Sequence, residues 1–373
     1  MIVILGAGCG RWGYGAQFDH AWTVDVFEDR MAGPATMGSP DELDPGAVGL
    51  SLREALVIAG NTPGTDRIGF SPRVFPRSAP ITIAPGSPLP EVAGDGTSVD
   101  GTGAGVEIDA TASAGPLVVI TGDDVTVRGL TFRSAGEDVI HLAGGHRVSI
   151  EDVTILDPAG RGIVLSSCSG VSILRARIER AGGDLISVTD CTDVTVAEAF
   201  MVIGDKDALR GINFLRVTDS RVIDNIIDPG EARLVNLADS SDNLIARNIL
   251  DRGHAGVVLE GESHGNLVIQ NSVISSTYDG VYVSSAATGN TVVHNTLFQC
   301  TTPIADGASD TVAANNLVST EASDFVDPVA YDFRLAPGSP HVDAAEDLGY
   351  DCLPDRSERF LGAAPDLGSV ESY

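Results

Sequence analysis

A short pattern recurs four times along the chain and decides the fold. The four copies are Val125-Thr-Val-Arg-Gly-Leu-Thr-Phe132, Val148-Ser-Ile-Glu-Asp-Val-Thr-Ile155, Val171-Ser-Ile-Leu-Arg-Ala-Arg-Ile178 and Val194-Thr-Val-Ala197. Each copy starts 23 residues after the one before it. Apolar residues alternate with polar or variable ones, as in a strand with one buried face. Strands this short cannot bury that face alone, so we expect the copies to stack on one another.

The repeat continues towards the C-terminus after one longer step. The frame resumes 27 residues after Val194, at Arg221, Leu244, Leu267, Thr291 and Thr311. A second strand recurs in step, with no helical stretch between the two. Its copies are Asp138–Leu142, Arg161–Leu165, Asp184–Val188, Arg210–Phe214, Arg233–Leu237, Ala255–Leu259 and Asp279–Val283. The sequence therefore predicts an all-β fold, a single-stranded parallel β-helix in which each strand pairs with its equivalent one coil later.

Composition excludes several classes of protein. The 373 residues are 43% hydrophobic, enough for a core, and 43 glycines with only 5% aromatics suit a chain of many turns and short strands. Lys and Arg number 23 against 52 Asp and Glu, a net charge of −29. Such a chain repels phosphate backbones, so no nucleic-acid partner is expected. No run approaches the ~20 apolar residues of a transmembrane span.

The two ends of the solenoid need covers, because raw strand edges invite pairing with other chains. Residues 51–60 predict a short amphipathic capping helix over the first coil, with Ser51 and Glu54 as a capping box and Gly60 as its stop. We divide the chain into an irregular start (1–47), the β-helix with its cap (48–320) and an irregular C-terminal cap (321–373).

Two further sets of residues share frame positions. Cys168 and Cys191 fall on equivalent positions, which places their Cα atoms ~4.8 Å apart, within reach of a disulfide. Stacked free thiols are the alternative. The other set predicts an internal ladder of side-chain amides. Its members are Asn225, Asn248, Asn271, Asn295 and Asn315.

The start of the expected solenoid resembles a known group of proteins. Ser51-Leu-Arg-Glu-Ala55, Asp66-Arg-Ile-Gly-Phe70 and Val99-Asp-Gly101 resemble the N-terminal region of bacterial surface β-helix proteins, whose Cys-Ser-Leu-Arg-Glu-Ala motif has Leu50 here in place of the cysteine. The tail from Asp332 to Asp343 is similar to the closing segment of the same group. The resemblance implies an exported, often surface-anchored, right-handed parallel β-helix with an extracellular or cell-surface location.

The first ten residues also bear on location. Met1-Ile-Val-Ile-Leu-Gly-Ala-Gly-Cys9-Gly resembles the end of a bacterial lipoprotein signal, with Cys9 as the lipidated residue and a start codon placed too late. That family prefers Leu three residues before the cysteine, where this chain has Gly6. The alternative is a hydrophobic first strand.

One face of the expected solenoid is polar. The position at the start of the second strand alternates in charge, and the outward position inside the same strand carries hydrogen-bonding groups, as binding of a linear polysaccharide requires. Surface ion pairs between neighbouring coils are the alternative reading of the charges. The predicted substrate-binding residues are His141, Ser187, Asn213, Asn236 and Tyr282.

Coil spacing limits which of these groups can act together. Residues one coil apart lie ~5 Å apart, so a site must come from neighbouring coils. The densest set runs from Asp184 through Arg210 to Arg233, beside the insertion that carries Lys206, the only lysine. We expect this insertion to form a wall of the site.

This region weakly resembles the β-helix pectate lyases. In that family a carboxylate cluster binds calcium, and downstream Lys and Arg side chains engage the uronate and remove its proton. The resemblance implies catalytic roles for Lys206, Arg210 and Arg233, and a Ca²⁺ site at Asp138, Asp152 and Asp184. The family's Trp-Ile-Asp-His and Arg-x-Pro-x-x-Arg elements are absent. Binding or scaffolding of a polysaccharide or cell-surface glycan is therefore the first hypothesis, and calcium-dependent lyase activity is the alternative.

Overall fold

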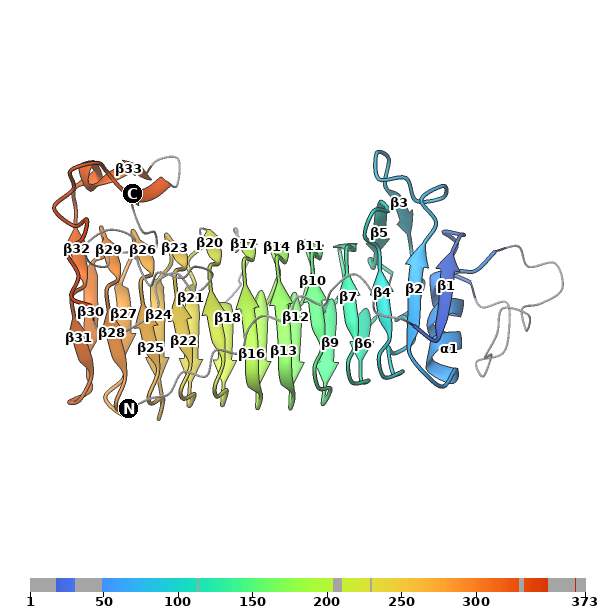
Figure 1. Ribbon diagram of the computed structural model, residues 1–373, viewed down its shortest axis with the longest axis horizontal. Helices are drawn as coiled ribbons and strands as arrows, with labels where there is room; N and C mark the ends of the chain where they lie inside the picture. The colour runs from blue at the N-terminus through green and yellow to red at the C-terminus, as the bar shows by residue number, and fades with distance from the viewer. Residues whose placement is uncertain are drawn as a thin grey trace.

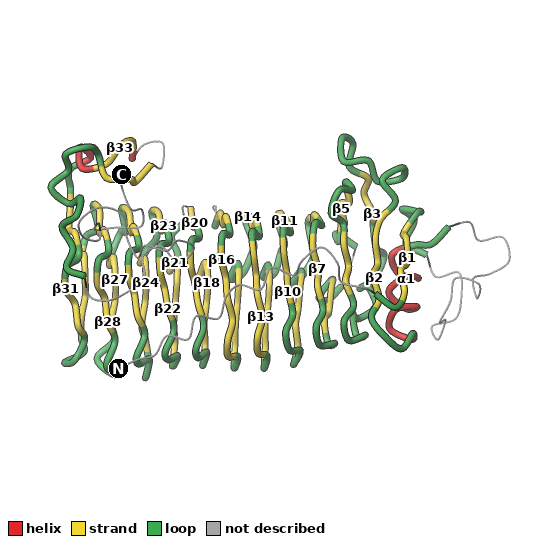
Figure 2. Tube along the Cα trace, in the orientation of Figure 1, coloured by secondary structure: helices red, strands yellow, loops and turns green. Residues whose placement is uncertain are grey.

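The described chain is a solenoid of three parallel sheets that run side by side along its length (Figure 1). This computed structural model describes residues 18–30, 49–112, 114–203, 210–228, 230–328, 332–347 and 366. Coil after coil repeats the same strands and turns (Figure 2). The predicted parallel β-helix is confirmed.

The first and second sheets hold short strands that follow each other closely in every coil. In the first sheet they are β1 (His20–Val24), β2 (Asp66–Phe70), β4 (Ser98–Asp100), β7 (Thr126–Arg128), β10 (Ser149–Glu151), β13 (Ser169–Leu174), β16 (Thr192–Ala197), β19 (Arg221–Ile223), β22 (Leu244–Ala246), β25 (Leu267–Ile269), β28 (Thr291–Val293) and β31 (Val312–Ala314). In the second they are β3 (Ile81–Ile83), β5 (Val106–Asp109), β8 (Thr131–Arg133), β11 (Thr154–Leu156), β14 (Arg177–Glu179), β17 (Phe200–Val202), β20 (Ile226–Asp228), β23 (Ile249–Asp251), β26 (Ser272–Ile274), β29 (Thr296–Phe298) and β32 (Leu317–Ser319).

The third sheet is built from the second strand of the sequence repeat. Its strands are β6 (Val118–Ile120), β9 (Ile140–Ala143), β12 (Ile163–Ser166), β15 (Ile186–Thr189), β18 (Arg210–Leu215), β21 (Arg233–Ala238), β24 (Ala255–Glu260), β27 (Asp279–Val283) and β30 (Thr302–Asp306). Inward-facing residues of all three sheets fill one continuous apolar core.

The four valines that define the repeat lie in one column. The pairing of Ser149 with both Thr126 and Ser172 places Val148 between Val125 and Val171, and Val171 pairs directly with Val194. All four valines are buried.

The frame resumes one residue earlier than the sequence predicted. Thr195 pairs with Arg221, so Ser220 and not Arg221 continues the valine column. The Ser220 hydroxyl accepts a hydrogen bond from the Val194 amide, 26 residues away, against 23 between ordinary neighbours. The longer coil therefore holds three extra residues, not four. They lie between Val202 and Arg210, because the pairing of Phe200 with Arg177 keeps the ordinary interval.

A ladder of buried asparagines runs through the later coils. Asn225, Asn248, Asn271 and Asn295 follow one another, and each backbone N–H donates to the side-chain oxygen one coil later at 2.9–3.0 Å. The last member is Asn316 rather than the predicted Asn315, which lies at the turn with a φ of 52°. A second ladder, not predicted, links Ser220 to Asn243, Asn266 and Asn290.

Cys168 and Cys191 share a column, as predicted, but no disulfide joins them. Both are free and buried, and the Cys168 amide donates to the Cys191 sulfur at 3.2 Å. The contact with the Cys191 sulfur, together with burial, raises the pKa of the Cys168 thiol. The same column continues with Val217, whose amide donates to the Ser240 hydroxyl at 3.0 Å.

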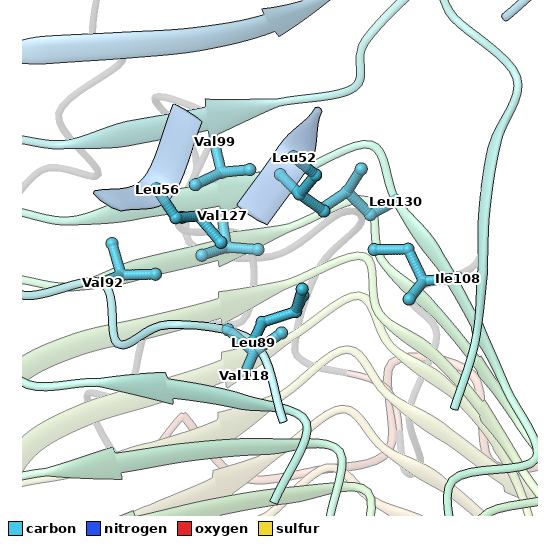
Figure 3. Close-up of a pocket in the computed structure, with 9 residues that line it drawn as sticks. All are labelled: Leu52, Leu56, Leu89, Val92, Val99, Ile108, Val118, Val127 and Leu130. Atoms are coloured by element: carbon cyan, nitrogen blue, oxygen red, sulfur yellow. The ribbon is translucent and has the colours of Figure 1, made fainter. Parts of the chain in front are cut away.

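A helix covers the first coils. Helix α1 (Leu52–Asn61) begins at the N-cap Ser51, which forms a capping box with Glu54. The helix ends one residue beyond Gly60, where the Thr62 hydroxyl donates to the Ile58 carbonyl at 2.6 Å. Nine apolar side chains line a small cavity between the helix and the coils beneath it (Figure 3). The apolar helix face thus packs on the open end of the core.

The other end carries a two-stranded antiparallel pair, β33 (Phe325–Asp327) with β34 (Asp332–Leu335). Phe325 packs edge-on against Phe298 of the solenoid, with ring centroids 5.2 Å apart. In the part of the chain that the structure describes, no helix is long and apolar enough to span a membrane. The irregular start predicted for residues 1–47 is wrong in one part, because β1 within it pairs with β2 and extends the first sheet. The domain boundary after residue 320 remains a prediction.

Candidate functional site

The outer face of the third sheet carries two columns of residues in consecutive coils. One column lies at the start of the strands, where Asp184 is followed by Arg210, Arg233, Ala255 and Asp279. The other lies within the strands and consists of His141, Val164, Ser187, Asn213, Asn236, Val258 and Tyr282. Both columns follow the register that the sequence predicted.

The best-connected part of this face surrounds Arg233. Its guanidinium donates to the side-chain oxygen of Asn236 at 3.0 Å and to the carboxylate of Glu260 at 2.6 Å. The Asn236 amide donates to Glu260 at 3.2 Å and to the Asn213 oxygen at 3.1 Å. Asn236 is fully buried by these contacts, whereas the Arg233 side chain stays 38% exposed.

Arg210 lies directly beside Arg233 in the neighbouring coil. Its guanidinium is 3.6 Å from the Asp184 carboxylate, an ion pair longer than a hydrogen bond. The buried Nε of Arg210 has no hydrogen-bond partner. Burial raises the pKa of the Asp184 carboxyl, although the positive charges of Arg210 and Arg161 oppose the rise. Asp184 is thus a buried carboxyl beside a guanidinium group that lacks one hydrogen-bond partner.

The three carboxylates predicted to hold calcium are not brought together. Asp138 and Asp184 lie two coils apart with Arg161 between them, and Arg161 binds Asp138 at 2.7 Å. Asp152 follows β10 of the first sheet and pairs with Arg175 at 2.7 Å. Among the described residues, no group of three or more His, Cys, Asp or Glu side chains is arranged to hold a metal ion. Each predicted ligand is engaged elsewhere, so these residues do not fit a calcium ion.

The other predicted residues divide into near and distant ones. Ser187 pairs with Asn213 and therefore joins the set around the arginines. His141 lies two coils before Ser187, and Tyr282 two coils beyond Asn236. Lys206 and Cys9 lie outside the described residues. One site therefore spans Asp184, Ser187, Arg210, Asn213, Arg233 and Asn236.

Sequence reasoning missed Glu260, which completes the network. Glu260 stands in register with Ala238, one coil after the strand of Arg233. At this outward position β12, β15, β18 and β21 carry Ser166, Thr189, Leu215 and Ala238. Glu260 is the charged residue among these five, and that difference is the signal from which the sequence could have identified it.

The arrangement can bind an anion between two guanidinium groups. Two like charges directly opposite each other on neighbouring strands destabilise a sheet. Asp184 and Glu260 offset this repulsion from the two sides, but both arginines keep exposed area, 29% for the Arg210 side chain and 38% for that of Arg233. The half-buried Asn213 adds an amide on the same face, and the buried Asn236 donates to its side-chain oxygen. Guanidinium groups with amides beside them suit a carboxylate that belongs to a hydroxyl-rich ligand.

Comparison with protein-family models assigns the chain to a family. A model described as the right-handed β-helix region matches residues 91–199 and, in a second overlapping match, 118–297. Together the matches cover more than half of the chain. The protein belongs to the right-handed β-helix family.

Solved structures agree with the fold and differ widely in sequence. The chain is similar to the pectate lyase Pel9A, with 15% identity, a TM-score of 0.52, and coverage of 96% of this chain and 98% of that one. It is also similar to PfbA, a surface adhesin of Streptococcus pneumoniae, with 13% identity, a TM-score of 0.44, and coverage of 63% and 82%. An alginate lyase from Paenibacillus has 12% identity, a TM-score of 0.43, and coverage of 71% and 96%. No curated protein sequence matches the chain.

Proposed function

We propose that the protein binds an acidic polysaccharide on the outer face of the third sheet. The observation that carries this proposal is the pair Arg210 and Arg233, in register on neighbouring strands with both guanidinium groups partly exposed and the buried Nε of Arg210 without a hydrogen-bond partner. A uronate carboxylate would bridge the two charges and relieve their repulsion. The half-buried amide of Asn213, which the buried Asn236 holds in place, would then take a hydroxyl group of the sugar.

A solenoid suits such a ligand for a geometrical reason. Equivalent groups recur at ~4.8 Å along the sheet, so a linear polymer meets the same kind of surface from coil to coil. The net charge of −29 opposes binding of a polyanion at long range. Recognition therefore depends on the local arginine pair, and we expect binding to weaken steeply with salt. The proposal places the protein outside the cell or at its surface, as the resemblance of the Ser51–Ala55 motif implies, with Cys9 as its proposed lipid anchor.

The test is a binding measurement with matched variants. Wild type is titrated with pectate, alginate and chondroitin by calorimetry, and Arg210→Ala and Arg233→Ala are compared with Arg147→Ala. Arg147 is a suitable control because it is also a partly exposed arginine paired with a carboxylate one coil away, Asp124, but it lies just before β10 of the first sheet. We expect the first two variants to lose about tenfold or more in affinity, as central charged anchors do, and the control to lose nothing. Binding that is equal in all variants would contradict the proposal.

Lyase activity is a second candidate, and one observation favours it. β-Elimination needs a positive group on the uronate carboxylate and a base for the neighbouring proton. Asp184, whose pKa burial raises, lies beside Arg210 and could accept that proton while the glycosidic C–O bond breaks and a C=C bond forms, with water protonating the leaving oxygen.

The same polysaccharides distinguish the two functions. Ultraviolet absorbance of the unsaturated product is followed with added calcium and with chelator. Product that disappears in Asp184→Asn and Arg233→Ala would establish the lyase, whereas tight binding without product would exclude it.

A further inference from the structure

An aromatic pair lies at the edge of the third sheet, beyond the arginines. His254 and Tyr278 come directly before β24 and β27, and the Tyr278 amide donates to the His254 carbonyl at 3.0 Å. Their ring centroids are 4.1 Å apart with planes tilted by 49°. The Tyr278 residue is 58% exposed, the most exposed of the large hydrophobic residues in the described chain. The ring is therefore supported from one side and open on the other.

The position of this pair relative to the arginines follows from the register. Arg233 pairs with Ala255, and Ala255 pairs with Asp279. His254 and Tyr278 are the residues just before these two partners. They therefore lie one and two coils beyond Arg233 at the same edge of the sheet, ~5 and ~10 Å along the solenoid.

A second exposed tyrosine belongs to the same coil. Tyr282, 37% exposed, stands in the outward column two coils beyond Asn236. Tyr278 and Tyr282 thus sit two coils past Arg233 and Asn236, respectively. Aromatic residues continue the same face after the charged groups end.

Exposed tyrosines of this kind suit one face of a sugar ring. Tyrosine offers a flat apolar body with a polar tip, and it fixes a partner at little entropic cost because it has few rotatable bonds. Tyr278 is further restrained by His254, which reduces the ordering needed on binding. Three aromatic side chains beside Asp279 and Arg233 offer too small an apolar area for a stable protein–protein interface.

We infer that His254, Tyr278 and Tyr282 form a stacking subsite for another ring of the polysaccharide, so that the polymer runs along the solenoid axis from Arg210 towards Tyr278. This inference rests on the proposed function. The inference predicts the direction in which the bound polysaccharide runs and the shortest oligosaccharide that binds with full affinity. A polymer lying parallel to the strands would meet the arginines but would not reach β27.

Oligosaccharides of increasing length test the direction. Uronate dimers to octamers are titrated into wild type, Tyr278→Ala, Tyr282→Ala and, as a matched exposed aromatic far from the site, Phe27→Ala. We expect wild-type affinity to rise once the oligomer reaches from the arginines to the aromatic residues. Tyr278→Ala should abolish that rise, a loss of about tenfold for the long oligomers, and leave the shortest ones unchanged. Tyr278→Phe keeps the ring and should bind as wild type does.

The outcomes separate the inference from the function on which it rests. If Arg233→Ala weakens binding but both tyrosine variants match wild type at every length, the subsite is wrong and the binding function stands. If the tyrosine variants weaken dimers and octamers alike, the axial direction is wrong. If no oligomer of any length binds wild type, both the function and the subsite are wrong.

Discussion

The early and late coils share one backbone geometry but fill the same interior columns with different chemistry. In the early coils Val125, Val148, Val171 and Val194 form one column. In the late coils Ser220, Asn243, Asn266 and Asn290 continue it. The neighbouring turn repeats the change, from Val153, Ala176 and Ala199 to the ladder that begins at Asn225.

The difference shows that burial, and not apolar character, is what the column requires. Each ladder amide is paired on both sides. Asn248, for example, accepts from Asn225 and donates to Asn271 and to the Val222 carbonyl, all within 3.0 Å. A buried polar group in a complete network of this kind carries no desolvation penalty for an unmade bond. Apolar columns tolerate loss of one member more easily than such a ladder does.

Removal of one amide should have the largest effect on stability. Asn248→Ala removes the acceptor of the backbone and side-chain N–H groups of Asn225 and the donor to the Val222 carbonyl. We expect a loss of about 3–5 kcal/mol, from ~1–3 kcal/mol for each unsatisfied group. Val153→Ala, in the equivalent column, should lose only about 1–3 kcal/mol. Denaturant unfolding of both variants measures the difference. Equal losses would mean that the ladder is no more sensitive than the valine column.

Placing an asparagine in the apolar column of the early coils should lower the free energy of unfolding by a smaller amount. Ala176→Asn puts one amide into the apolar half without a neighbouring amide to receive its protons. We expect a loss of about 1–3 kcal/mol, typical of an overpacked core. Calorimetric unfolding of this variant beside Ala176→Ser, a smaller polar substitution, separates volume from polarity. A variant as stable as wild type would show that ladders can be extended freely into the early coils.

Acid should loosen the late coils before the early ones. His294 follows β28, is 1% exposed, and neither ring nitrogen has a hydrogen-bond partner. Burial lowers its pKa, and the nearby backbone of Glu346 and the negative charges of Asp347 and Glu346 only partly offset this. A base with a lowered folded pKa binds protons more readily when unfolded, so stability is lost as the pH falls below the ordinary histidine pKa of ~6.5.

Hydrogen exchange at pH 7.5 and 5.5 measures this asymmetry. After correction of the rates for the slower intrinsic exchange in acid, we expect lower protection factors at pH 5.5 around β28–β34, unchanged protection around β7–β13, and loss of the pH effect in His294→Gln. An equal loss of protection at both ends, or an unchanged response in His294→Gln, would rule out this histidine as the cause.

The smallest effect on stability is expected in a column where the early and late coils make the same kind of hydrogen bond. Cys191 accepts from the Cys168 amide much as Ser240 accepts from Val217 in the same column. We therefore expect Cys191→Ser to change stability by less than about 1 kcal/mol. Because both thiols are free in the structure, reducing agent should leave the melting temperature unchanged. A clear drop on reduction would show that the disulfide predicted from the sequence forms after all.

The sequence predicted the solenoid well because its evidence was periodic. A constant 23-residue interval fixes which residues stack, and the columns of His141 and Asp184 followed without knowledge of any contact. The frame slipped at Ser220 because the column changes from valine to polar residues at the very coil that is lengthened. Asn315 and Asn316 are adjacent, so the alternation pattern alone could not choose between them.

The site was harder to predict because it depends on how far side chains reach. Register gave Arg210 and Arg233 as neighbours, but not that Glu260 would extend to Arg233 from the next coil. The register itself separates two of the predicted calcium ligands, since Arg161 lies in the coil between Asp138 and Asp184 and binds Asp138. The repeat length predicts which residues stack, but not the side-chain conformations that bring residues of different coils into contact.

One consequence of the stacked architecture concerns length. Each coil touches only its two neighbours, so the gap between the arginines and Tyr278 is a whole number of coils. Adding one complete coil between them would widen that gap by ~4.8 Å and leave both groups intact, whereas adding an incomplete one would shift every following residue to the wrong side of its sheet. The distance between the two groups is therefore set in steps of one coil, and duplication of a single coil would lengthen the proposed binding face by one such step.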